Sequence, residues 1–118
     1  MPRTVPLFKP EADLLGTLAH PIRLQILEVL RGGEACVCHL QAVLQRRQAY
    51  ISQHLMALRE AGLVTSHKEG LRVYYQLSDP HILEVLRNVR AVAHSCNGDA
   101  PLSPPRGQCH CPQCQRQS

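Results

Sequence analysis

Three observations in the sequence predict a mainly α-helical fold with one small β-hairpin. Apolar residues recur at helical spacing through most of residues 11–62 and again after residue 78, whereas residues 63–77 alternate with a period of two. The length of 118 residues suggests one domain. Because 44% of the residues are apolar but only 3% are aromatic, we expect a modest, aliphatic core.

The stretch 47–62, RQAYISQHLMALREAG, is the helix around which the chain is organised. Ile51, Leu55 and Leu58 form one apolar stripe. The opposite side is short, uncharged and able to form hydrogen bonds, which suits the major groove of DNA. Gly62 is expected to end the helix. The alternative at this point is an ordinary amphipathic surface helix.

Four segments precede this helix. Residues 1–10 contain three prolines and are predicted to be an irregular arm. Helices are expected over 11–19, over 21–31, where proline opens the helix, and over 36–44. A tight turn at 45–47 then joins the third helix to the fourth, which makes a helix-turn-helix. The core positions expected in these helices are Ile22, Ile26, Val29, Leu30, Val37, Leu40 and Leu44.

After Gly62, apolar and polar residues alternate in the segments 63–68 and 71–77, which lie on either side of Glu69-Gly70. This pattern predicts a two-stranded hairpin. Such a hairpin must pack on the helices. At its tip, Lys68 and Arg72 would reach the DNA backbone or minor groove as a wing. Residues 46–72 carry a net charge of +3 out of +4 for the whole chain, and local positive charge attracts phosphate.

A fifth helix is expected from a cap at Ser78 to about Ser95. Its apolar stripe has little left to pack on in a small domain, so we expect a homodimer contact formed with the 11–19 helix. Residues 97–118 are rich in Pro, Gly and Gln and are predicted to be a flexible tail. The folded domain is therefore expected to cover 11–96.

Six cysteines are present, three of them in the tail. No secretory signal and no apolar run long enough to span a membrane is visible, so a cytoplasmic protein is expected. Clustered thiols in that setting are expected to bind metal or to sense redox state rather than to form a disulfide framework.

Three pieces of the chain carry a family resemblance: LAHPIRLQILEVLRGGEACVCHL, ISQHLMALREAGLV and KEGLRVYYQLS. In this order and spacing they resemble the ArsR/SmtB family of metal-responsive repressors. The resemblance implies a winged helix-turn-helix of five helices and a β-wing, a homodimer, and operator DNA bound without metal and released with it. It implies a DNA-contacting segment of Gln48, Tyr50, Ser52, Gln53 and His54. Arg47 stands where relatives often have a capping Ser, and is expected to contact a phosphate instead.

The segment EACVCHL resembles the ELCVCDL box of arsenic-sensing members, which implies Cys36 and Cys38 as ligands. The two thiolates can converge at a frayed helix start, whereas a fully regular helix would point them about 200° apart, so binding a soft ion is expected to distort the helix. As(III) and Sb(III) want three thiolates, and Cd(II) or Pb(II) takes three or four. Arsenic-sensing relatives have a further Cys where this chain has Gln41. The possible sources of the missing ligand are Cys96 and the tail residues Cys109, Cys111 and Cys114. The preferred interpretation is that the tail reaches the Cys36/Cys38 pair, on the same or the partner subunit; alternatively, the tail trio could bind As(III) alone.

Three alternatives stay open. Asp79 and His81 match part of a Zn(II) site of relatives, but the rest is out of register, so a helix start is the preferred interpretation. The same scaffold could carry a redox switch in which Cys36, Cys38 and tail thiols form disulfides. A thiol enzyme using Cys111 and Cys114 is disfavoured because this motif lies in a proline-rich tail rather than at a helix start.

Overall fold

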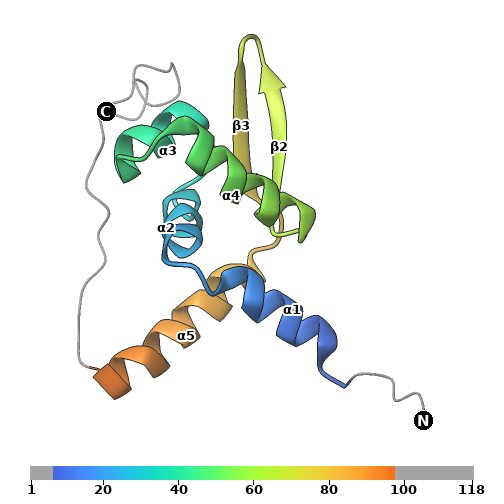
Figure 1. Cartoon of the computed structure of the whole chain (residues 1–118), viewed down its shortest axis with the longest axis vertical. Coiled ribbons are helices and arrows are strands. Elements are labelled where there is room, and N and C mark those ends of the chain that lie inside the picture. Colours follow the sequence, from blue (N-terminus) through green and yellow to red (C-terminus); the bar gives the residue numbers. More distant parts are fainter. Residues whose placement is uncertain (1–6, 98–118) are drawn as a thin grey trace.

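The computed structural model of the protein describes residues 7–97, with side chains as far as residue 95. This part contains five helices and three strands (Figure 1). None of its helices combines the length and the apolar character that a membrane crossing requires. The elements are α1 (Lys9–Leu18), α2 (Pro21–Leu30), β1 (Ala35–Cys36), α3 (Val37–Leu44), α4 (Gln48–Glu60), β2 (Val64–Glu69), β3 (Arg72–Leu77) and α5 (His81–Asn97).

The core lies where α2, α3 and α4 meet, and it is aliphatic as expected. The predicted stripe of α4 is confirmed, since Ile51, Leu55 and Leu58 are all fully buried. In α3 the structure buries Leu40 and also Val43, a position that the sequence interpretation missed. The largest fully buried side chains are Ile26, Leu27, Leu40, Ile51, Leu55, Leu58 and Val64.

The expected two-stranded hairpin is part of a three-stranded antiparallel sheet with the order β1-β3-β2. β2 and β3 pair along their full length, and their tip is formed by Gly70 and Leu71 rather than by Glu69-Gly70. Gly70 has a φ of 61°, which favours glycine. The third strand, β1, pairs Cys36 with Tyr74. A two-residue strand is too short to display a period, which is why no sequence pattern predicts it.

Several predicted boundaries were wrong. Helix α1 begins at Lys9, inside the expected irregular arm, because proline at position 10 is compatible with a first helical turn. Ser78 does not cap α5; its hydroxyl donates to the carbonyl of Gly62. Instead, the carboxylate of Asp79 accepts the backbone N–H of His81 at 2.9 Å, so α5 begins later than expected.

Helices α1 and α5 lie at the end of the molecule opposite the hairpin tip and diverge from α2 (Figure 1). Both present apolar side chains to solvent. Leu15 of α1 is 54% exposed, and Val89 and Val92 of α5 are 43% and 65% exposed. Leu7 and Phe8, just before α1, are exposed as well. This end of the molecule therefore has unburied apolar surface, whereas the apolar stripe of the helix-turn-helix is buried in the core.

Replacing Leu55 with Ala should lower the free energy of unfolding by about 2–5 kcal/mol, because the deletion leaves a cavity in the core. The matched control on the same helix is Met56→Ala, since Met56 is 62% exposed. That change should stay within about 0.5 kcal/mol. Urea unfolding at equal protein concentrations measures both values. A similar loss in the two variants would contradict the burial pattern of α4.

Candidate functional site

Helix α4 and the turn before it present a largely uncharged, exposed surface edged by arginines. The turn starts at Gln45, whose φ of 55° ends α3 in a left-handed conformation. Arg47 follows in an extended conformation as the N-cap residue of α4, and its side chain does not cap the helix. The exposed candidates for DNA contact on this surface are Arg47, Gln48, Tyr50 and Gln53, and Ser52 is half-buried.

His54 lies differently from the other DNA-contact candidates because its ring is tied to α2. The Nε of Arg23 donates to His54 Nδ1 at 3.1 Å, and an Arg23 Nη donates to the Thr17 carbonyl at 3.0 Å. Burial lowers the pKa of His54, and the nearby charges of Arg23 and His20 lower it further. A neutral imidazole is required for this bond, since Nδ1 must accept. His54 thus joins α4 to the α1–α2 region.

Tyr50 links this histidine to the helix-turn-helix turn. Its ring meets the ring of His54 edge-on, with 4.7 Å between centroids. The guanidinium of Arg46 lies 5.9 Å from the Tyr50 ring centroid, within the range of a cation–π contact. Tyr50 nevertheless remains 41% exposed, so part of its side chain is open to solvent while its ring contacts these neighbours.

The hairpin carries the two wing candidates in different settings. Lys68 is exposed on β2, and Leu71 at the tip is 98% exposed. Arg72, in contrast, has a guanidinium N–H that donates to the sulfur of Cys38 at 3.3 Å. The role of Arg72 as a DNA contact therefore stays a prediction. Its contact with Cys38 is one that the sequence did not suggest.

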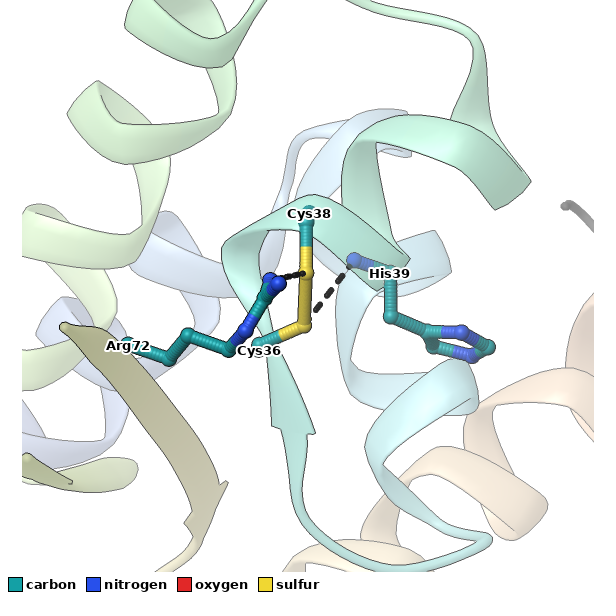
Figure 2. Close-up of a disulfide and its surroundings, with 4 residues drawn as sticks. All are labelled: Cys36, Cys38, His39 and Arg72. Carbon is teal, nitrogen blue, oxygen red and sulfur yellow. Dashed lines mark hydrogen bonds between the residues drawn. A yellow bond between two sulfur atoms is a disulfide. The ribbon is translucent and has the colours of Figure 1, made fainter. Parts of the chain in front are cut away.

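Cys36 and Cys38 are joined by a disulfide at the start of α3 (Figure 2). Cys36 precedes the helix in an extended conformation as its N-cap, and its sulfur accepts the backbone N–H of His39 at 3.3 Å. Cys38 lies in the first helical turn. The expected helix distortion is therefore not needed to bring the sulfurs together, because only one of the two cysteines is helical.

The sulfur pair also contacts the sheet. Cys36 is paired with Tyr74 across β1 and β3, and the two side chains pack together with Cys38 against them. Cys36 is 1% exposed, whereas Cys38 is half-buried. The stacked rings of His67 and Tyr74, 5.6 Å apart, extend this contact to β2. A chemical change at the two sulfurs would therefore affect the contacts that they make with both α3 and the wing.

The remaining metal-ligand candidates are not assembled in the described part of the chain. The backbone of Cys96 lies near the end of α5, but its side chain and all of Cys109, Cys111 and Cys114 lie outside the described residues. Within the described residues, no three His, Cys, Asp or Glu side chains are grouped to hold a metal ion. Asp79 and His81 bond to each other, with 2.7 Å between Oδ1 and Nδ1, at the start of α5.

Comparison with known proteins addresses the family. The sequence model described as "Bacterial regulatory protein, arsR family" matches residues 20–66. The arsenical resistance operon repressor of Staphylococcus xylosus is 32% identical over 102 residues, which cover 86% of this chain and 98% of that protein. The chain belongs to the arsR family of bacterial regulatory proteins. The HTH-type transcriptional repressor SmtB of Mycobacterium tuberculosis, also similar, is 40% identical over 83 residues; these cover 70% of this chain but only 60% of that repressor.

Solved structures agree with this arsR-family assignment and with the winged helix-turn-helix fold. Rv0081 of M. tuberculosis has a TM-score of 0.72 at 34% identity, covering 79% of this chain and 94% of that one. The homodimeric winged helix-turn-helix DNA-binding domain of Mb0332 from Mycobacterium bovis has a TM-score of 0.70 at 26% identity, covering 87% and 100%. Reduced HlyU from Vibrio cholerae has a TM-score of 0.63 at 33% identity, covering 76% and 90%.

The lowered pKa of His54 predicts a loss of stability in acid. The unfolded chain binds the proton more tightly, so stability should fall as pH drops from about 7.5 to about 5.5, through the usual histidine range. His54→Gln can still accept from Arg23 but cannot titrate, and its unfolding midpoint in urea should fall less over this range. Some loss of stability should remain in this variant, because burial also lowers the pKa of His39.

The control variant for this prediction has the opposite sign. Asp79 raises the pKa of His81, so His81 stabilises the protein increasingly as pH falls. His81→Gln should therefore make the acid loss steeper than in the parent chain. An equal slope in the parent and in His54→Gln would contradict the role assigned to the Arg23–His54 bond.

Proposed function

We propose that the protein is a dimeric transcriptional repressor that leaves its operator when As(III) or Sb(III) binds the thiolates of Cys36 and Cys38. One observation carries the proposal: the two sulfur atoms meet at the start of α3, the first helix of the helix-turn-helix, with only a short turn between α3 and α4. An event at the sulfurs therefore has a short path to the proposed DNA-reading helix.

Operator recognition would use the exposed face of α4. Gln48, Ser52 and Gln53 have the hydrogen-bonding groups that read base edges in the major groove. Arg47 would contact a phosphate at the helix start, and Lys68 would do so from the wing. We do not assign His54 to the bases in this proposal, because its Nδ1 already accepts from Arg23; its contribution would be to fix the position of α4.

Dimerisation would use the end of the molecule formed by α1 and α5. The exposed apolar side chains there, Leu15, Val89 and Val92, would be buried against a second copy. The similar Mb0332 domain is described as homodimeric, which supports this arrangement. A two-fold dimer would present two α4 helices to the two halves of a palindromic operator.

The inducer is assigned from the chemistry of the donors. In a cytoplasmic setting the disulfide would be reduced, and two neighbouring thiolates favour a soft ion. The similarity to an arsenical resistance operon repressor supports As(III) or Sb(III). A third thiolate would come from Cys96, Cys109, Cys111 or Cys114, in the same or the partner subunit. Cd(II), Pb(II) or Zn(II) is the alternative ion on the same scaffold.

Coupling between the two sites would run through the contacts of the sulfur pair. A bound ion adds bulk and charge where Cys36 packs on Tyr74 and where Arg72 meets Cys38. Shifting these contacts would move α3 and the wing relative to each other. Allosteric coupling of this kind is worth about 1–3 kcal/mol, and DNA would weaken ion binding by the same amount.

A second candidate function is a redox-switched repressor, and the Cys36–Cys38 disulfide favours it. In this case oxidation itself, without metal, would change DNA affinity through the same contacts. The similarity to HlyU, for which a reduced form has been solved, agrees with this alternative.

Gln53→Ala should weaken binding to the operator by about 1–3 kcal/mol if its amide reads a base. Binding to random DNA of equal length should change much less. Gln25→Ala on α2 is the matched control, because Gln25 is also exposed but belongs to a different helix. Anisotropy titrations on both DNAs measure these effects. An equal loss on operator and random DNA would make Gln53 a backbone contact.

Replacing both Cys36 and Cys38 with Ser should preserve operator binding and abolish release by arsenite. Serine at position 36 can still accept the His39 N–H as an N-cap, so α3 should keep its start. Ala42→Ser, which adds a hydroxyl to the same helix and keeps both cysteines, should respond like the parent. Release of the double variant at the parent's arsenite concentration would refute the site.

A further inference from the structure

A groove beside the sulfur pair has no role in the proposed function. It is shallow and open to solvent, with a volume of about 540 Å³. It reaches from the start of α3 to the turn before α4. The residues that line it are Cys38, Gln41, Ala42, Gln45, Arg46 and Arg47.

The lining of this groove has a definite chemistry. Two of its lining residues, Arg46 and Arg47, carry positive charge, and Gln41 and Gln45 have amide side chains that can donate and accept hydrogen bonds. These six lining residues include no carboxylate. An anionic ligand with further hydrogen-bonding groups is therefore attracted, because guanidinium groups pair well with carboxylates.

The two sulfurs differ in how they can be reached. Cys38 lines the groove, whereas Cys36 is 1% exposed and packs against Tyr74. Of the two cysteines, a thiolate arriving in the groove therefore meets Cys38 first. The sulfur of Cys36 already accepts the backbone N–H of His39 at 3.3 Å, at the N-terminus of a helix, where negative charge is stabilised. The guanidinium of Arg72, which donates to Cys38 Sγ at 3.3 Å, would stabilise a thiolate on Cys38 as well, so the difference in access, and not in leaving-group quality, directs the attack to Cys38.

We propose that this groove binds an anionic low-molecular-weight thiol, of the class that carries a carboxylate, and that this thiol exchanges with the disulfide at Cys38. The incoming thiolate forms a bond to Cys38 Sγ while the Cys36–Cys38 bond breaks. The electron pair of that bond leaves on Cys36 Sγ, which later takes a proton from water. The disulfide itself is the oxidant, so no other redox partner is needed.

Arg46 and Arg47 make the groove selective, and they also connect it to the DNA-facing turn. A carboxylate held by these arginines competes with phosphate for the same charge. The thiol adduct would therefore act against DNA binding without metal. This consequence rests on the proposed function, but the exchange reaction does not.

The test uses the oxidised full chain and three small thiols at equal thiolate concentration. They are anionic 3-mercaptopropionate, neutral 2-mercaptoethanol and cationic cysteamine. Samples are quenched with acid, labelled with maleimide, and the peptide that holds both cysteines is mapped by mass. The adduct should form on Cys38, and the anionic thiol should react roughly tenfold faster than the cationic one, a factor that screened charges a few ångströms apart can supply.

Three double variants make the result specific. Arg46→Gln with Arg47→Gln should reduce the preference for the anionic thiol, leaving only the part due to Arg72 beside Cys38 Sγ, and Arg46→Lys with Arg47→Lys should retain it. Arg87→Gln with Arg90→Gln on α5 changes the net charge equally at a distant site and should also retain it. Adducts on Cys36, equal rates for the three thiols, or an unchanged preference in the Gln variant would overturn the proposal. DNA does not enter the measurement, so failure of the repressor proposal would leave its outcome intact.

Discussion

The pairing of β1 with β3 is the constraint on which the site depends. It sets Cys36 opposite Tyr74 and so fixes the sulfur pair against the sheet. Because Cys36 is also the N-cap of α3, the same residue fixes where the helix-turn-helix begins. One backbone register thus positions the sulfurs, the first helix of the motif and the root of the wing. Without it, a disulfide or a bound ion would be a local event on a surface loop.

The second consequence of this arrangement is that α4 has two supports of different kinds. Its apolar stripe, Ile51, Leu55 and Leu58, is fully buried and holds it to α2 and α3. Its polar flank is held by Arg23 through the ring of His54. The exposed face of α4 takes part in neither of these contacts. Packing therefore holds the helix in place. The neighbours of Cys38, in contrast, are Arg72 and the groove lined by Arg47, and these polar contacts can rearrange when the sulfurs change their chemical state.

Much of the fold could be predicted because its signals are periodic. The stripe of α4 repeats at helical spacing and the hairpin alternates, so both were found. β1 was missed because two residues have no period, and the Arg23–His54 bond because residues 31 positions apart show no local pattern. The resemblance identifies Cys36 and Cys38, and a frayed helix start is one of the arrangements that the sequence suggests for them. The extended conformation of Cys36, which brings the sulfurs together, depends on its pairing with β3.

The central claim is that the chemical state of the Cys36–Cys38 pair sets DNA affinity. The most direct measurement is fluorescence anisotropy on labelled operator DNA, with one preparation of the full chain divided into reduced, arsenite-loaded and oxidised samples. The account predicts tight binding by reduced protein and a Kd at least about fivefold weaker with arsenite, the lower end of typical allosteric coupling. Weakening only on oxidation would select the redox switch. Equal affinity in all three states would contradict the claim.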